Sequence, residues 1–141
     1  MNYLIDTCVL SEYVKKSPDN LVIEWLNQQR IETLFLSAIT IAEIKKGICR
    51  IKLSQPKRHK ALTDWLNNQI QVKFFGKVLP ITDNVLNNWA EISANAELEG
   101  QKMAVMDSLI AATAYTHKLI LVTRNVDDFK MAPIEIVNPF Q

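Results

Sequence analysis

Short apolar runs alternate with longer helical stretches along this chain, and the alternation limits the folds that it can adopt. Such runs predict buried strands, because a strand covered on both faces does not show the polar alternation of a half-exposed one. Strands that alternate with helices favour an α/β fold with a mainly parallel sheet. We expect about four or five short strands, at residues 3–5, 33–36, 78–81, 119–122 and 134–137.

The helical stretches carry their own start signals. Pro18 follows Ser17 and opens a segment with apolar residues at helical spacing. No repeat, low-complexity tract or Pro/Gly/Ser-rich linker divides the chain, so residues 1–141 are expected to form a single domain. Further helices are expected over residues 40–50, from Pro56 to about residue 70, after the N-cap residue Thr82, and over residues 107–115.

The charges are nearly balanced in number, with 16 basic and 15 acidic residues, but the bases are unevenly placed. A segment that is rich in bases and lacks acids would attract a polyanionic partner. Alternatively, it forms the solvated face of two helices and a turn. Composition alone leaves both interpretations open. No acidic residue lies between Ile44 and Thr63, where the bases are Lys45, Lys46, Arg50, Lys52, Lys57, Arg58 and Lys60.

The cysteines and histidines argue against a disulfide-stabilised domain and against a zinc protein. Cys8 and Cys49 are too few for a disulfide framework, and together with His59 and His117 they show no zinc-ligand spacing. No apolar run approaches the length of a membrane span, and the N-terminal residues lack the pattern of a signal peptide. We therefore expect a cytoplasmic protein.

Acidic and amide residues fall where the expected strands end and the following helices begin. Asp6 ends the first strand, Glu43 lies in the first turn of the helix expected at residue 40, and Asp107 opens an Ala-rich helix. Asn125 and Asp128 follow the strand expected at 119–122. Ligands of such sheets bind in the crevice outside the carboxyl ends of the strands. These five side chains, and Asp127 beside Asp128, are therefore expected to face one crevice.

Each acid also has a purely structural explanation. Asp6 and Asp107 suit helix N-termini, Thr40 and Glu43 have the spacing of a capping box, and Asp128 suits a turn. Several carboxylates in one crevice, however, repel one another unless a cation neutralises them. Ligand sets made only of oxygen favour Mg²⁺ or Mn²⁺ over zinc.

Four motifs resemble those of PIN-domain proteins and occur in the order found in that family. Within it, the chain most resembles the VapC- and FitB-type toxins of prokaryotic toxin–antitoxin pairs. It departs from the common pattern at Cys8, where Asn is usual, at Ala104, where Pro is frequent, and at Asn125, where many relatives carry a fourth acid. The motifs are Asp6-Thr7-Cys8-Val9-Leu10-Ser11-Glu12, Ile41-Ala42-Glu43-Ile44, Met106-Asp107-Ser108-Leu109-Ile110-Ala111-Ala112-Thr113-Ala114, and Leu121-Val122-Thr123-Arg124-Asn125 with Asp128-Phe129.

The resemblance implies an α/β/α sandwich and an endoribonuclease that uses Mg²⁺ or Mn²⁺ to cut single-stranded RNA. Asp6, Glu43 and Asp107 occupy the family's metal-site positions, and either Asn125 or Asp128 would complete the site. In-line attack by an activated water would leave a 5′-phosphate and a 3′-hydroxyl. The resemblance also implies a homodimer and a cognate antitoxin, a peptide of which covers the active-site groove.

Residues beside the acids are expected to support this chemistry. Thr7 and Thr123 flank the carboxylates and are candidates for hydrogen bonds that orient them. Lys45, Lys46 and Arg50 follow Glu43 on its helix and are candidates for contacts to RNA phosphates.

The sequence disfavours two other functions and leaves two more open. A phosphate-receiving signalling domain would need an acidic pair after the first strand, and a phosphatase with an aspartyl nucleophile would need an Asp where Cys8 stands. A non-catalytic PIN-like module that binds RNA or protein stays open, because Asn125 replaces the usual fourth acid. A PIN nuclease of RNA maturation also stays open.

Overall fold

A five-stranded parallel sheet forms the centre of the molecule. In a computed structural model that describes residues 1–141, the strand order is β3-β2-β1-β4-β5. Every neighbouring pair of strands is parallel, and β1 is the middle strand. The predicted α/β class is confirmed. The strands are β1 (Tyr3–Ile5), β2 (Leu34–Ser37), β3 (Val78–Leu79), β4 (Ile120–Val122) and β5 (Ile136–Val137).

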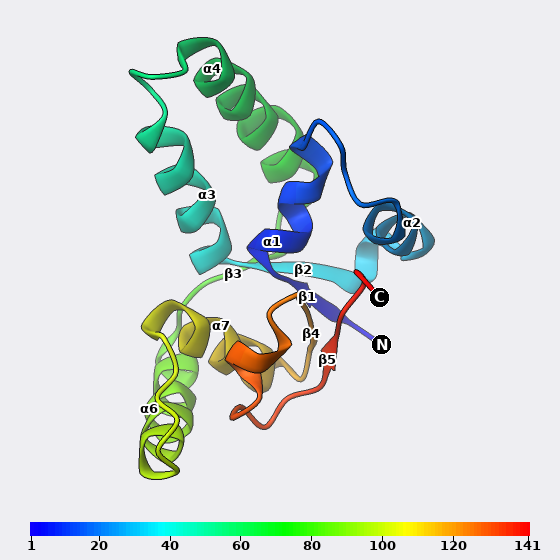
Figure 1. Ribbon diagram of the computed structural model, residues 1–141. Coiled ribbons are helices and arrows are strands. Elements are labelled where there is room, and N and C mark those ends of the chain that lie inside the picture. The colour runs from blue at the N-terminus through cyan, green and yellow to red at the C-terminus, as the bar shows by residue number, and fades with distance from the viewer.

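Helices cover both faces of this sheet, which gives the three-layered α/β/α sandwich (Figure 1). No helix is both long enough and apolar enough to cross a membrane. One face carries α1 (Thr7–Leu10), the 3₁₀ helix η1 (Ser11–Val14), α2 (Asn20–Gln28), α3 (Ala38–Arg50), α4 (Pro56–Trp65), the π-helical turn η3 (Leu66–Ile70) and α5 (Gln71–Lys73). The other face carries α6 (Asp83–Leu98) and α7 (Val105–His117), and two 3₁₀ turns, η2 (Ile31–Thr33) and η4 (Val126–Phe129), lie in the connections.

Two hydrophobic cores hold the layers together. Successive side chains of a strand point to opposite faces, so each strand contributes to both cores. Ile5 and Val122 pack beneath α1 to α4, while Leu4 and Leu121 pack against α6 and α7. All four are fully buried, and burial of one such side chain contributes about 1.5–3 kcal/mol. This two-sided burial explains why the strands read as continuous apolar runs.

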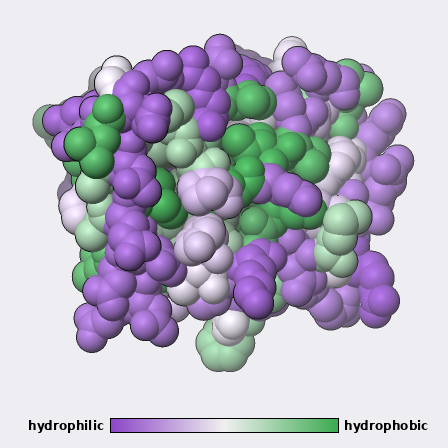
Figure 2. All heavy atoms as spheres, turned by 90° about the horizontal axis from the view of Figure 1, so that it is seen from below, coloured by the Kyte–Doolittle hydropathy of each residue, from purple (hydrophilic) through white to green (hydrophobic).

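The outer surface is mixed. On the side of the molecule where α6 and α7 lie, hydrophobic patches are interrupted by hydrophilic side chains (Figure 2). Large apolar side chains exposed on these two helices are Leu86, Leu98, Val105, Met106 and Tyr115.

The helix that carries Glu43 begins earlier than the sequence predicts. It starts at Ala38 instead of Thr40, because Ser37 is its N-cap and accepts a hydrogen bond from the Ile39 amide at 3.0 Å. The expectation that Glu43 lies in the first helical turn is therefore wrong. Glu43 lies in the second turn, with its own amide inside the helix.

Two other helix starts also differ from the prediction. Asp19 caps α2 by accepting a hydrogen bond from the Leu21 amide at 2.9 Å, so the helix begins after Pro18 and not at it. α7 begins at Val105, two residues before the predicted start, and Asp107 remains in its first turn. The edge strands β3 and β5 have two residues each, fewer than predicted.

The direction of the chain across the sheet reverses between β1 and β4. From β1 the chain moves outward through β2 to β3, and it then crosses to β4 on the other side of β1. Open α/β sheets bind ligands at such a switch point, outside the carboxyl ends of the strands. Asp6 directly follows β1 and Thr123 directly follows β4, so both residues lie at this point.

Candidate active site

Asp6 joins the ends of the two strands that flank the switch point. Its carboxylate is buried; Oδ1 accepts a hydrogen bond from the Thr7 amide at 2.8 Å, and Oδ2 accepts one from Thr123 Oγ1 at 2.7 Å. Asp6 is therefore the N-cap of α1, as its structural explanation expected. Each carboxylate oxygen can accept more than one bond, so capping leaves Asp6 able to bind a cation as well.

Glu43 approaches the same region from α3. Its Oε1 accepts a hydrogen bond from Thr7 Oγ1 at 2.7 Å, and no backbone amide donates to it. The capping-box explanation of Thr40 and Glu43 is wrong, because Ser37 caps the helix and Thr40 lies inside it. The carboxylate of Glu43 is thus directed toward α1 and away from its own helix end.

The start of α7 is fixed by a short chain of hydrogen bonds. Trp89 Nε1 of α6 donates to Ser108 Oγ at 2.8 Å, and Ser108 Oγ donates to the Val105 carbonyl at 2.7 Å. This chain ties α6 to the first turn of α7. It positions the residue next to Ser108, which is Asp107.

Asp107 experiences the charges of the other acids. Partial burial, followed by the charges of Asp6, Asp128 and Glu43, raises the pKa of Asp107 from 3.8 to about 6. The charges of these three carboxylates reach Asp107, although Glu43 lines a different cavity from the one that Asp107 and Asp128 share. The sequence expectation of one crevice rested on topology, and these charge interactions support it.

The raised pKa makes Asp107 a source of instability at neutral pH. The folded protein binds this proton more tightly than the unfolded chain does, so the stability that the group contributes is full below pH 3.8 and is lost as the pH rises to about 6. Without metal, Asp107→Asn should therefore raise the melting temperature at pH 8. Solvent screening of this partly exposed group limits the gain to roughly 1 kcal/mol, or about 3 °C.

Thermal unfolding of both proteins at pH 8 and pH 5 measures this effect. The difference in melting temperature should shrink at pH 5 and on addition of Mg²⁺. A variant that is less stable than the parent at pH 8 contradicts the assignment.

Asn125 and Asp128, the two candidates for the fourth ligand position of the metal site, are arranged differently. Asp128 lines a cavity of about 420 Å³ together with Asp107 and Asp127, and its charge contributes to the raised pKa of Asp107. Asn125 donates its backbone amide to Thr123 Oγ1 at 3.0 Å, and its exposed side chain makes no hydrogen bond. Of the two, Asp128 is the one placed with the acids.

Cys8 lies against this cluster. Its Sγ is 3.7 Å from Asp6 Oδ2 and 3.6 Å from Thr123 Oγ1. Burial and the neighbouring charge of Asp6 raise the pKa of the thiol, which keeps it protonated. Cys8 therefore offers Asp6 a weak S–H donor.

The oxygen donors fit a hard divalent cation in chemistry and charge. Asp6, Glu43, Asp107 and Asp128 present only carboxylate oxygens, the ligands that Mg²⁺ and Mn²⁺ prefer. No three His, Cys, Asp or Glu side chains lie close enough to hold one ion in their present arrangement. Joint ligation by three of these acids therefore requires their side chains to rotate toward one another.

The basic residues predicted to contact RNA lie outside this cluster. Lys45, Lys46 and Arg50 are all exposed on α3 and form no ion pair with the four acids. The structure leaves them free to contact another molecule, but it does not bring them to the carboxylates.

Sequence reasoning missed two charged residues beside the site. Glu12 is only 1% exposed; its Oε1 accepts the Asp19 amide at 2.9 Å, and its Oε2 lies 2.6 Å from Lys15 Nζ and 4.0 Å from Arg124 Nη2. The Arg124 guanidinium stacks on the Phe140 ring at 3.9 Å. The available signal was the place of Glu12 in the first motif and of Arg124 in the fourth. Nothing in the sequence indicates the pairing of Arg124 with Phe140.

Comparison with known proteins agrees with the motifs. Residues 3–134 match the family model described as PIN domain. The chain belongs to the PIN-domain family. It is 35% identical over 138 residues to the VapC ribonuclease Y4jK of Sinorhizobium fredii, covering 98% of this chain and 97% of that protein. It is likewise 35% identical over 137 residues to the toxin FitB of Neisseria gonorrhoeae, covering 97% of each.

Solved structures of the PIN-domain family include close matches to this fold. The crystal structure of FitAcB from Neisseria gonorrhoeae superposes with a TM-score of 0.93 at 34% identity and covers 99% of each chain. The resemblance drawn from the sequence motifs is therefore confirmed over nearly the whole chain.

Proposed function

We propose that this PIN-domain protein is a Mg²⁺- or Mn²⁺-dependent endoribonuclease and the toxin of a type II toxin–antitoxin pair. The observation that carries the proposal is the raised pKa of Asp107, to which Asp6, Glu43 and Asp128 all contribute. A module that only binds gains nothing from placing repelling acids at a ligand-binding sheet edge, whereas a metal site needs them. The relatives named VapC ribonuclease and toxin FitB align over nearly the full chain, which supports the same activity.

Within this proposal the acids have distinct roles. Asp6 and Asp107 hold the cation, Glu43 ligates it or orients the attacking water, and Asp128 rather than Asn125 fills the fourth position. A bound divalent cation supplies an activated water and neutralises charge that develops on the phosphate.

The hydroxyl groups around the acids keep them in place for this work. Thr7 donates to Glu43, and Thr123 donates to Asp6, each at 2.7 Å. These bonds orient the carboxylates of Asp6 and Glu43 before any cation binds, so the rotation that joint ligation requires would come mainly from Asp107 and Asp128, whose side chains make no hydrogen bond. The exposed cations Lys45, Lys46 and Arg50 would contact RNA phosphates on the α3 side.

Partners follow from the same family relation. We propose a cognate antitoxin protein as the physiological inhibitor, a homodimer as the assembly of the toxin, and the cytoplasm as its location. Val72 and Phe75 are 66% and 87% exposed, and apolar side chains this open to water are common at protein interfaces.

Incubation of the purified protein with a 5′-labelled single-stranded RNA tests the activity. We expect Mg²⁺ or Mn²⁺ to support cleavage that leaves 5′-phosphate and 3′-hydroxyl ends, and excess EDTA to stop it. Cleavage that persists in EDTA would overturn the metal dependence. RNA that is bound but left intact with either metal would favour the non-catalytic module instead.

A further inference from the structure

The turn that follows β4 orients the carboxylate of Asp6. Thr123, the first residue of this turn, is fully buried, and its Oγ1 donates a hydrogen bond to Asp6 Oδ2 at 2.7 Å. The same oxygen accepts a hydrogen bond from the Asn125 amide at 3.0 Å. Because Thr123 Oγ1 bonds to both groups, a shift of the turn moves the hydroxyl that orients Asp6. The direction of the Asp6 carboxylate therefore depends on what fixes residues 123–125.

The sheet fixes the start of this turn. The Thr123 amide donates to the Val137 carbonyl of β5 at 3.0 Å. The next backbone hydrogen bond is local, because it joins the Val126 amide to the Arg124 carbonyl at 2.9 Å. Contacts of side chains must therefore hold the turn after Thr123.

The side chain of Arg124 provides such contacts on two sides. Its guanidinium carbon lies 3.9 Å from the centre of the Phe140 ring, and its Nη2 lies 4.0 Å from Glu12 Oε2. A planar guanidinium can stack its face on an aromatic ring and direct its edge to a carboxylate at the same time. The side chain is 50% exposed, so these two contacts and not burial set its orientation.

Both partners of Arg124 are themselves anchored. Glu12 is buried and is held by Lys15 and by the Asp19 amide. Phe140 packs against the core beneath α1 to α4, and Figure 1 shows the chain after β5 running toward this face of the sheet. Arg124 thus connects η1 with the segment after β5, across the turn that orients Asp6.

We propose that Glu12 and Phe140 clamp Arg124, and that the clamped Arg124 is a positioning residue for the carboxylate of Asp6. The inference rests on the proposed metal-dependent activity, in which Asp6 holds the cation. Arg124 acts through the position of Thr123 and not through its charge, because a positive charge near the acids by itself opposes the binding of a cation. The two effects have opposite signs: loss of the charge alone would strengthen metal binding, whereas loss of the clamp weakens it.

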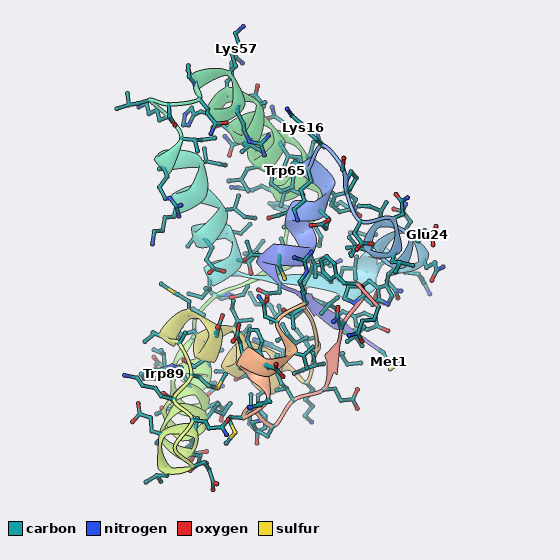
Figure 3. The ribbon with its side chains drawn as sticks, viewed as in Figure 1. Met1, Lys16, Glu24, Lys57, Trp65 and Trp89 are labelled. Atoms are coloured by element: carbon teal, nitrogen blue, oxygen red, sulfur yellow. The ribbon has the colours of Figure 1, made fainter.

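Two substitutions of Phe140 and one of Arg124 test the clamp in the full chain. Phe140→Leu keeps an apolar side chain but cannot stack on the guanidinium, Phe140→Tyr keeps the ring, and Arg124→Met removes the charge and the stack. Mn²⁺ affinity, measured by calorimetry, should fall at least about 3-fold in Phe140→Leu and Arg124→Met and stay within about 2-fold of the parent in Phe140→Tyr. Lys16→Met is the control for the lost charge, because Lys16 is exposed and forms no ion pair (Figure 3), and it should not weaken binding.

Amide hydrogen exchange of the metal-free protein tests the same clamp without any metal. The amides of Asn125 and Thr7 report on the turn and on Asp6, because they bond to Thr123 Oγ1 and Asp6 Oδ1. Phe140→Leu should speed the exchange of both amides at least about 3-fold and leave that of the α6 amides unchanged. Faster exchange over the whole chain would mean that Phe140 only stabilises the fold, and it would overturn the proposal.

The two measurements separate this inference from the proposed function. A parent protein that binds no Mn²⁺ fails the proposed function, and locally faster exchange in Phe140→Leu then keeps the positioning of Asp6 by the clamp. If the parent binds Mn²⁺, unchanged affinity in Phe140→Leu or tighter binding in Arg124→Met overturns the proposal. Exchange that is unchanged in Phe140→Leu overturns it whether or not the metal binds.

Discussion

Asp6→Asn is expected to lower metal-dependent RNA cleavage by at least about 100-fold without unfolding the protein. Asparagine keeps one oxygen to accept the Thr7 amide, and its side-chain NH2 can donate to Thr123 Oγ1 in place of the bond that Thr123 now donates, so the cap of α1 and the link to β4 can persist. It removes the negative charge that attracts the cation. Loss of residues behind a metal already costs about 10–100-fold, and loss of a charged ligand should cost more.

The pair Asp127 and Asp128 provides a matched control for the same measurement. Both line the cavity that contains Asp107, but only Asp128 contributes to the raised pKa of Asp107. Asp128→Asn should lower cleavage by at least about 10-fold, and Asp127→Asn should change it by less than about 2-fold. Full activity of Asp6→Asn, or a larger loss in Asp127→Asn than in Asp128→Asn, contradicts the assignment of the acids.

Glu12→Ala is expected to lower the free energy of unfolding by about 2–3 kcal/mol. The substitution leaves the Asp19 amide without its acceptor and Lys15 and Arg124 without their shared anion. Breaking a buried charge pair costs about 3–5 kcal/mol, but the half-exposed Lys15 can regain water, which reduces the loss. Urea unfolding at pH 7 measures it.

The contribution of Glu12 to the stability of the fold should increase as the pH rises, whereas that of Asp107 should decrease. Burial alone would raise the pKa of Glu12, but hydrogen bonds from Lys15 and the Asp19 amide and the charges of Lys15 and Arg124 outweigh it, so the pKa is lowered. The stability from Glu12 is therefore present above its usual pKa of 4.5 and is lost as the pH falls through the folded-state value. The exposed Glu24, labelled in Figure 3, is the control: Glu24→Ala should change stability by less than about 0.5 kcal/mol. Equal losses for the two variants contradict the buried role of Glu12.

The sheet could be predicted because its strands are buried on both sides. Residues such as Leu4 and Ile5 enter different cores, so no polar residue interrupts the run, and the pattern reveals the strand directly. The short edge strands β3 and β5 were predicted too long. At an edge, the apolar residues beyond the paired ones are kept by packing against helices and not by the sheet, and the pattern does not separate the two causes.

The start of α3 could not be predicted because two residues compete to cap it. Ser37 and Thr40 are both good N-caps, and Glu43 three residues after Thr40 favours the later start. The structure uses Ser37, whose position at the end of β2 is set by pairing with Leu79 of β3. This long-range pairing releases Glu43 from capping and directs it to Thr7.

Topology predicts that Asp6, Glu43 and Asp107 lie at the same edge of the sheet, but it does not choose between the two candidates for the fourth ligand position. Choosing between Asn125 and Asp128 requires the course of the 3₁₀ turn η4, which places Asp128 in the cavity lined by Asp107, whereas Asn125 does not line that cavity. The sequence shows only that both residues follow β4. The contacts of Glu12 with Lys15, Asp19 and Arg124 could not be predicted either, because they depend on how distant parts of the chain fold together.

A titration of Mn²⁺ into the metal-free protein at pH 7.5, followed by calorimetry, measures whether the carboxylates at the switch point form a metal site. The parent protein should bind Mn²⁺ saturably, and Asp107→Asn should bind it at least about 10-fold more weakly, while Asp127→Asn should match the parent. No saturable binding to the parent, or equal affinity of the parent and Asp107→Asn, would contradict a metal site built from these acids.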